Sequence, residues 1–224
     1  MKFNILTLFP EYFEGFKQIS IIKRAIELGH IEINIVNWRN FSTEKHQKVD
    51  DKVYGGGQGM LLQVQPIDLA LQTVEGKKIL LSPQGKTFTQ KMAREFAKQD
   101  EITLVAGHYE GFDERILNFV DEEISIGDYV LTGGEIPAML IVDAIARLSP
   151  GVIRESSHLE ESFEGDGLLD FPQYTRPSEY KGFKVPEVLL NGDHAKIKAW
   201  RDEAKYQKTL KNRPDLIERI KNEK

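Results

Sequence analysis

Apolar and polar positions follow two patterns along the first 150 residues of the chain, one typical of strands and one of helices. Residues 2–9 are predicted to form a buried strand, and residues 31–35 alternate isoleucine with polar residues as a half-buried strand does. Between them, residues 11–28 carry apolar side chains at spacings of three or four, which predicts one helix that ends at Gly29.

The same alternation continues to residue 148. Residues 78–81, 102–106 and 123–126 are short strand candidates, and residues 87–98 and 136–148 are helix candidates. Alternating strands and helices predict an α/β fold, with a parallel sheet and helices on both of its faces. In such sheets, ligands bind at the loops beyond the carboxyl ends of the strands.

From about residue 149 the pattern changes. Residues 149–170 are polar and acidic without a clear period, and residues 171–186 contain three prolines and are expected to be extended. Residues 193–208 and 214–221 are predicted helices, each with an aspartate near its start and a lysine near its end. We interpret this part as a linker followed by a small helical domain.

Composition limits the class of protein. The chain of 224 residues is long enough for one large domain, or for one domain and a smaller one. It has no cysteine, which excludes disulfides, thiolate zinc sites and thiol nucleophiles and agrees with a reducing cytosol. The short apolar stretch at the N-terminus lacks the pattern of a signal peptide, and no apolar run is long enough for a membrane helix.

Charge is distributed unevenly along the chain. The net charge is −5, yet residues 171–224 carry 13 Lys and Arg against 8 Asp and Glu. A basic tail on an acidic body suggests a module that contacts a polyanion. A solvated helical surface is the alternative explanation of the same pattern.

Four glycine-containing segments follow or adjoin the predicted strands. They are Y-G-G-G-Q-G-M at 54–60, L-L-S-P-Q-G at 80–85, A-G-H-Y-E-G-F-D-E-R at 106–115 and S-I-G-D-Y-V-L-T-G-G-E-I-P at 125–137. Bare backbone lets a ligand approach closely, and glycines at a helix start present N–H donors to a ligand. Segment 54–60 has a flexible linker as its alternative, and the turn at 80–85 has a structural role as its alternative.

Two residues of the third segment could carry chemistry. His108 is a candidate base or ligand, although a lone loop histidine is usually solvated. Glu110 is the better candidate, because a carboxylate gains Coulomb energy near a sulfonium or an amine. Motifs for a P-loop, for a zinc metalloprotease helix and for a serine-hydrolase elbow are absent from the sequence, and the five histidines lack metal-ligand spacing.

Taken together, the four segments resemble the bacterial tRNA (guanine-N1)-methyltransferase family, the TrmD type of the SPOUT class. The resemblance runs from Phe3 to the C-terminal helices and includes G-D-G-L-L-D-F-P-Q-Y-T-R-P at 165–177. It implies transfer of the methyl group of S-adenosyl-L-methionine to N1 of the guanine at tRNA position 37, in the cytoplasm. A requirement for Mg²⁺ would agree with the family but is left open by the sequence.

The resemblance also implies an organisation that composition does not show. The expected parts are a knotted cofactor-binding domain at 1–154 with a deep trefoil knot, a linker at 155–170 that carries the base, and a helical tRNA-binding domain at 171–224. Members of the family are homodimers that share each active site between subunits.

Residue by residue, the family's motifs assign three sets of positions. The expected cofactor-binding residues are Leu80, Leu81, Ser82, Pro83, Gly107, Tyr109, Glu110, Ile126, Gly127, Asp128, Tyr129, Val130, Leu131, Gly133, Gly134 and Pro137. The expected substrate-binding residues are Tyr54, Gly55, Gly57, Gly59 and Asp170. The expected catalytic residues are Glu161 and Arg147.

Guanine N1 carries a proton at neutral pH, so the reaction needs a base near N1 and a donor for the charge that develops on O6. The family places an aspartate base before the Ser-Phe pair of the linker, where this chain has Glu161, and an arginine where it has Arg147. Glutamate is one methylene longer than aspartate, so the neighbouring Glu160 is a second candidate base. The alternatives are a solvated linker carboxylate for Glu161 and a charge at a helix C-terminus for Arg147.

Two other functions are weighed against methyl transfer. A non-enzymatic RNA-binding protein on the same scaffold would not need all three cofactor segments. A nicotinamide-dependent oxidoreductase would need the G-x-G-x-x-G fingerprint after the first strand, and the sequence lacks it.

Overall fold

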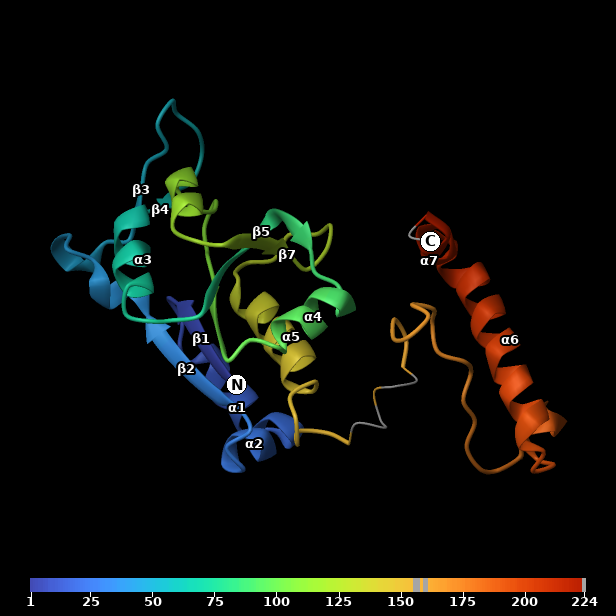
Figure 1. Cartoon of the computed structure of the whole chain (residues 1–224). Helices are drawn as coiled ribbons and strands as arrows, with labels where there is room; N and C mark the ends of the chain where they lie inside the picture. The colour runs from blue at the N-terminus through green and yellow to red at the C-terminus, as the bar shows by residue number, and fades with distance from the viewer. Residues whose placement is uncertain (155–157, 159–160, 223–224) are drawn as a thin grey trace. The chain divides into compact units, whose positions relative to one another are not determined.

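The computed structural model of the chain describes residues 1–154, 158 and 161–222. It divides into two compact units, Met1–Ile153 and Arg154–Lys224 (Figure 1). No helix among the described residues is both long and apolar enough to cross a membrane.

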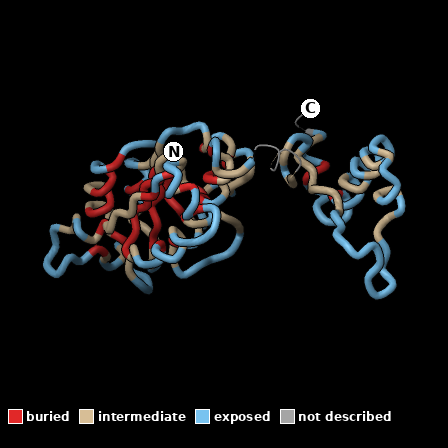
Figure 2. Tube along the Cα trace, turned by 90° about the horizontal axis from the view of Figure 1, so that it is seen from below, coloured by how far each residue is buried: buried red, intermediate tan, exposed pale blue. Residues whose placement is uncertain are grey.

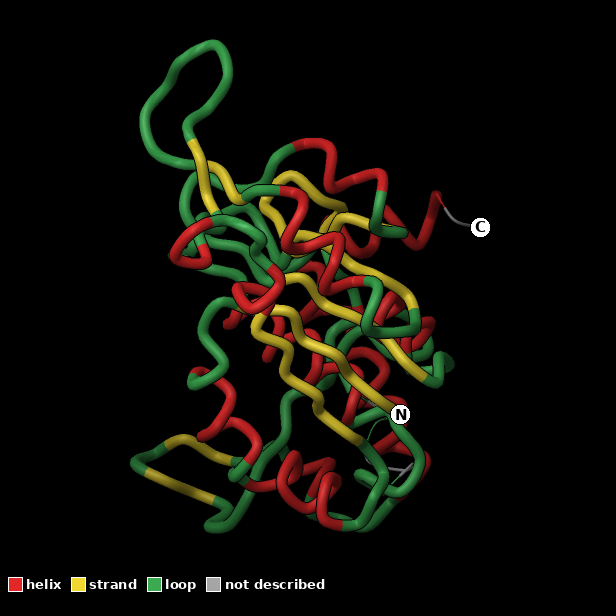
Figure 3. Tube along the Cα trace, turned by 90° about the vertical axis from the view of Figure 1, so that its left-hand side faces the viewer, coloured by secondary structure: helices red, strands yellow, loops and turns green. Residues whose placement is uncertain are grey.

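The first unit is built on a five-stranded sheet in the order β2-β1-β6-β5-β7, drawn in yellow in Figure 3. Its strands are β1 (Lys2–Thr7), β2 (Glu32–Asn37), β5 (Lys77–Thr87), β6 (Glu101–Val105) and β7 (Glu122–Ser125). Neighbouring strands are parallel throughout. The prediction of a parallel central sheet with helices is therefore confirmed.

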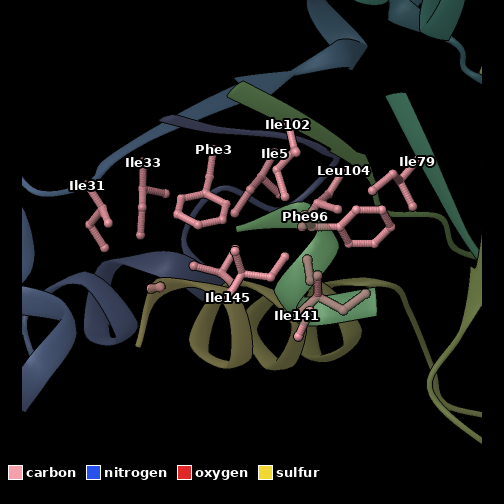
Figure 4. Close-up of a cluster of buried hydrophobic side chains, with 14 of the residues drawn as sticks. Phe3, Ile5, Ile31, Ile33, Ile79, Phe96, Ile102, Leu104, Ile141 and Ile145 are labelled. Carbon is pink, nitrogen blue, oxygen red and sulfur yellow. The ribbon is translucent and has the colours of Figure 1, made fainter. Parts of the chain in front are cut away.

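Helices cover both faces of this sheet because successive strand residues point to opposite sides. One face packs against α1 (Tyr12–Lys17), α2 (Ser20–Glu27), α4 (Gln90–Phe96) and α5 (Glu135–Ala146). Figure 4 shows strand side chains such as Phe3 and Ile5 directed at Ile141 and Ile145 of α5.

The opposite face packs against α3 (Val64–Leu71) and the 3-10 segments η1 (Trp38–Phe41) and η3 (Glu114–Asn118). Beside it lie a short 3-10 turn, η2 (Lys45–Gln47), and a two-stranded sheet of β3 (Asp50–Asp51) and β4 (Leu61–Leu62). The sheet is thus the middle layer of three, with helices on each of its faces.

The single helix predicted over residues 11–28 is wrong in one respect. The chain breaks between α1 and α2, where Ile19 is extended at ψ 133° and Ser20 adopts φ +50°. Both helices pack on the same face of the sheet through Phe13, Ile22 and Ala25, whereas Ile19, at the break, is 64% exposed. That shared face explains why the sequence pattern suggested an uninterrupted helix.

The second unit contains two helices and a hairpin. Its helices are α6 (His194–Asn212) and α7 (Pro214–Asn222), preceded by a 3-10 turn, η5 (Glu187–Leu189). The segment expected to be wholly extended also contains an antiparallel pair, β8 (Glu179–Tyr180) and β9 (Phe183–Lys184).

Burial differs between the units, as the red and blue tubes in Figure 2 show. Described buried residues of the second unit are Thr209, Leu216 and Ile217. The turn at 161–170 is tied to α6, because the Leu169 amide donates to Thr209 Oγ1 at 3.0 Å. This turn therefore belongs to the second unit.

Candidate functional site

The carboxyl ends of β6 and β7, together with residues 80–84 of β5, where the β5–β7 pairing is irregular, surround a cavity of about 390 Å³ in the first unit. Three of the four glycine-containing segments meet there, because parallel strands end at the same edge of the sheet. The lining consists of Leu61, residues 80–84, 107–112, 114, 116–117, 123–127 and 129–134, and Pro137.

The predicted cofactor residues are gathered at this cavity. All of them except Asp128 line it. The described lining does not include the predicted substrate-binding residues, nor Arg147 and Glu161. Their roles remain predictions, since the cavity shows only which side chains and backbone segments are brought together.

Gly134 is required where two of the segments touch. Its amide donates to the carbonyl of Gly107 at 2.8 Å, so the start of α5 lies directly on the end of β6. A Cβ at this position would stand 2.7 Å from Ala106 Cα and 2.8 Å from Gly107 N. A side chain at Gly134 would therefore push the two segments apart and open the wall of the cavity.

The loop after β6 is held by the strand that follows the glycine-rich segment. The Glu110 amide donates to the carbonyl of Met60 at 3.2 Å, and the Leu62 amide donates to the carbonyl of Gly111 at 2.9 Å. The Asp113 amide then donates back to Leu62 at 2.9 Å. Segment 54–60 is thus anchored beside the cavity at its C-terminal end.

The tip of segment 54–60 is open. Tyr54 is 97% exposed, and no atom lies within 4 Å of where a Cβ on Gly55 or Gly57 would stand. At Gly59, by contrast, a Cβ would run into the Glu110 side chain. The predicted substrate-binding part of this segment therefore extends from the edge of the cavity into solvent.

A buried carboxylate lies behind the cavity wall. Glu135 is 1% exposed, its Oε1 accepts a hydrogen bond from Thr7 Oγ1 at 2.6 Å, and its Oε2 lies 2.7 Å from His108 Nε2. The expectation that His108 is a solvated loop residue is wrong, because its side chain is 14% exposed and paired. Sequence reasoning missed Glu135, because a glutamate in a helix's first turn is ordinarily exposed and serves the dipole.

Another carboxylate shapes the turn at the cavity's edge. The guanidinium of Arg115 lies 2.6 Å from Asp113 and its hydrogen bond lowers the pKa of that carboxyl group. Asp113 Oδ1 also accepts from the Arg115 amide at 3.0 Å and so caps η3. This pairing fixes the start of the turn whose Ile116 and Leu117 line the cavity.

The two predicted catalytic residues belong to different units. Arg147 is the residue that caps α5, and its amide donates to the Asp143 carbonyl at 3.2 Å. Glu161 opens the turn at 161–170 in the second unit, where its carbonyl accepts from the Glu164 amide at 3.2 Å. Glu160, the second candidate base, lies outside the described residues.

Asp170 is held within the second unit. Its two carboxylate oxygens accept hydrogen bonds from the Phe171 amide and from Gln173 Nε2, both at 2.7 Å. Its own amide donates to Ser162 Oγ at 2.9 Å, which closes the turn at 161–170. The predicted substrate residue is thus fixed in orientation next to the predicted base.

The described part of the chain contains no cluster of side chains that could bind a metal ion by themselves. No group of three or more histidine, aspartate or glutamate side chains gathers there, as a metal held by protein ligands alone would need. Mg²⁺ is usually held by one or two carboxylates together with waters, so the Mg²⁺ requirement stays a prediction, and no step of the reaction is assigned to a metal.

Comparison with known proteins identifies relatives along nearly the whole chain. The model of the family described as tRNA (Guanine-1)-methyltransferase TrmD matches residues 1–219. A protein of Metamycoplasma arthritidis named tRNA (guanine-N(1)-)-methyltransferase is 68% identical over 99% of this chain and 97% of its own length. Proteins of the same name from Mycoplasmopsis agalactiae and Mycoplasmopsis synoviae are 66% and 62% identical over 100% of both chains.

Proposed function

The chain belongs to the tRNA (guanine-1)-methyltransferase TrmD family, and from this membership we propose that it methylates N1 of the guanine at tRNA position 37. The methyl donor is S-adenosyl-L-methionine, as the activity of a methyltransferase family implies. The observation that carries the proposal is the cavity bounded by β5, β6 and β7.

This cavity fits the cofactor in size and in chemistry. Its volume of about 390 Å³ lies within the range of small-molecule sites. Apolar side chains such as Leu80 and Ile126 offer a surface for a flat base, while Glu110 and Glu123 place carboxylates in the lining where a cation gains Coulomb energy. When bound, the cofactor supplies a methyl group on a sulfonium, which is already activated for transfer.

The chain's own residues then have to prepare the nucleophile. We assign Glu161 as the base that takes the proton of guanine N1, and Arg147 as the cation that offsets the charge developing on O6. A positioned base contributes on the order of 10²- to 10⁴-fold to the rate. A guanine in the anticodon loop must leave its stack first, and the open tip at Tyr54–Gly57 is where we expect it to enter.

The trefoil knot expected of the family is part of the proposal. Support comes from the path of the chain after β7, which lies at the sheet's edge beside β5. The next helix, α5, begins against the end of β6, through the Gly134–Gly107 hydrogen bond, and against β1, through the Thr7–Glu135 bond. The chain therefore crosses back over β5, as the return of a knotted loop requires.

The second unit is proposed to contact the tRNA. It contains the basic segment 171–224, and its β8–β9 hairpin presents Tyr180 and Phe183 at 63% and 80% exposure. Lys181 lies over the Tyr180 ring at 5.4 Å, and Lys184 is on the neighbouring strand. Aromatic faces combined with lysines are typical of surfaces that bind unpaired nucleotides.

A homodimer in the cytoplasm completes the proposal, since family members share each active site between two subunits. Exposed apolar side chains on and beside α2 offer a surface for the second copy. These are Ile19, Ile21 and Leu28, which are 64%, 46% and 57% exposed.

The deciding experiment is methylation of two tRNA transcripts that differ only in having guanine or adenine at position 37. We expect transfer from labelled S-adenosyl-L-methionine to the guanine transcript alone. Equal labelling of both would overturn the assigned substrate. Calorimetric titration with S-adenosyl-L-methionine separates the enzyme from a non-enzymatic RNA-binding protein, which would give no heat.

A further inference from the structure

We propose that Glu135 is a positioning residue, whose buried carboxylate holds His108 and with it the loop at 107–111 in the shape that binds the cofactor. The inference rests on the proposed function, because it concerns how the same cavity is kept ready for S-adenosyl-L-methionine. It assigns roles to Thr7, His108 and Glu135, which otherwise have none in the reaction.

The three side chains form a chain that runs from behind the cavity wall to the cavity itself. Neither Thr7 nor Glu135 belongs to the described lining, whereas His108 does. Thr7 Oγ1 donates to Glu135 Oε1 at 2.6 Å and accepts from the Phe9 amide at 2.9 Å. Glu135 Oε2 then meets His108 Nε2 at 2.7 Å, so an effect of Thr7 on the cavity has to pass through Glu135.

Both Thr7 and Glu135 are buried, so their hydrogen bonds are shielded from water. Thr7 is 0% exposed and Glu135 is 1% exposed. Among the buried residues that the structure describes, Glu135 alone carries an ionisable group. A buried carboxylate without partners is strongly unfavourable. The hydrogen bonds of Glu135 to the Thr7 hydroxyl and the His108 imidazole therefore keep all three side chains in place. The network is therefore a rigid link between three elements.

These elements are the ones that build the cavity. Thr7 ends β1, His108 lies in the loop after β6, and Glu135 begins α5 directly after the Gly133-Gly134 pair. A Cβ at Gly133 would stand 2.6 Å from Glu135 Oε2 and still closer to the His108 ring. The absence of a side chain at Gly133 thus leaves space for the His108–Glu135 pair. This is a second reason for glycine at this position, besides letting a ligand approach the backbone.

The imidazole is also fixed from its other side. The rings of Phe9 and His108 meet edge to face with centroids 4.5 Å apart. With Glu135 on one ring nitrogen and Phe9 against the ring, His108 has little freedom, and its neighbours Gly107 and Tyr109 are set at the cavity. Tyr109 keeps a left-handed backbone at φ +60°, a conformation that persists only where the surrounding contacts impose it.

The test compares two variants of the full chain, Thr7→Val and Thr7→Ser. Thr7 is chosen because it does not line the cavity. Valine keeps the shape but removes the hydroxyl, while serine keeps the hydroxyl. Residues that orient ligating side chains in metal sites typically matter about 10- to 100-fold. By that analogy we expect Thr7→Val to raise the dissociation constant for S-adenosyl-L-methionine about tenfold, and Thr7→Ser to restore affinity close to that of the unaltered chain.

A merely structural role would give a different result. In that case Thr7→Val would melt at a lower temperature, yet its folded form would bind S-adenosyl-L-methionine as tightly as the unaltered chain, and the proposal would be wrong. Glu135→Gln gives a second measurement if Thr7→Val fails to fold, since the amide can still accept from Thr7. We expect it to weaken binding as well, and the double variant to be no weaker than the worse single one.

Asp143→Asn is the matched control, because Asp143 is an exposed carboxylate on the same helix, α5. It should leave the dissociation constant unchanged. If the unaltered chain itself gives no heat with S-adenosyl-L-methionine, the proposed function fails and this inference fails with it. If the unaltered chain binds while Thr7→Val and Glu135→Gln bind equally well, only the inference fails.

Discussion

The two units of this protein differ most in what they bury. Met1–Ile153 encloses two apolar clusters on opposite faces of a sheet and a buried Thr7–Glu135–His108 network, whereas Arg154–Lys224 buries few described residues and carries the basic segment. The first unit holds the described cavity, and the second carries the exposed rings of Tyr180 and Phe183. On the proposed function, the cofactor depends on the first unit, while the substrate and the base depend on the second.

Glu161→Gln tests this division of roles between the two units. Of the predicted effects, its effect on the rate of methyl transfer should be the largest. The variant should transfer methyl groups on the order of 10²- to 10⁴-fold more slowly, because the amide cannot take the proton of guanine N1. Its dissociation constant for S-adenosyl-L-methionine should not change, because the cavity belongs to the other unit. Single-turnover methylation and calorimetry measure the two quantities separately.

Glu164→Gln is the matched control, since it alters a carboxylate three residues further along the same turn. Near-normal turnover in Glu161→Gln would contradict the assignment. A loss in Glu160→Gln instead would move the base to that neighbour and leave the division between the units in place.

Substitutions in the β8–β9 hairpin of the second unit should give the next largest effect, a fall in tRNA affinity. Replacing Lys181 and Lys184 by glutamine removes two charges beside Tyr180 and Phe183. If each lysine meets one phosphate of single-stranded RNA, tRNA affinity should fall about fivefold per lysine at about 0.1 M salt, and the salt slope by roughly 0.7 each. Filter binding over a salt series measures both.

Lys91→Gln, an exposed lysine on α4 of the first unit, is the control and should change neither quantity. An unchanged salt slope in the hairpin variant, together with an altered oligomeric state, would mean that the hairpin meets a protein surface instead.

Much of the first unit could be predicted, because its pattern is local. Strand periodicity placed β1, β2, β5, β6 and β7 within a few residues, apart from the unforeseen extension of β5 to Thr87, and the glycine segments were expected at the ligand edge of the sheet. The break at Ile19–Ser20 could not be predicted, since Ile19 keeps the apolar spacing of a single helix although its side chain is 64% exposed.

Contacts between residues distant in sequence were the part that the sequence concealed. Thr7 and Glu135 are 128 residues apart, and neither belongs to a motif that marks a buried pair. The order of the strands, which brings β1 beside β6, is what places Thr7 near His108 and Glu135. The hairpin at Glu179–Lys184 was hidden by the prolines around it, which favour extended chain without revealing the turn at Lys181–Gly182.

The smallest expected effect concerns acid sensitivity of the first unit. Asn4 Nδ2 donates to Glu101 Oε1 at 2.5 Å and Lys2 Nζ lies 3.1 Å from it, which together lower the pKa of Glu101. A carboxyl group whose pKa is lower in the folded chain stabilises the fold above its ordinary pKa. That contribution is lost as the pH falls below about 4.3 and through the lowered pKa.

Glu101→Gln should therefore reduce the free energy of unfolding at pH 7 by about 1 kcal/mol or less, with the difference vanishing in acid. The chain has two tryptophans, Trp38 in the first unit and Trp200 in the second, so urea unfolding can be followed in each unit by replacing the other with phenylalanine. The Trp38 signal should show the change and the Trp200 signal should not. The exposed Glu95→Gln is the control, and superimposed pH curves for Glu101→Gln and the unaltered chain would show that this carboxylate adds nothing to the first unit's stability.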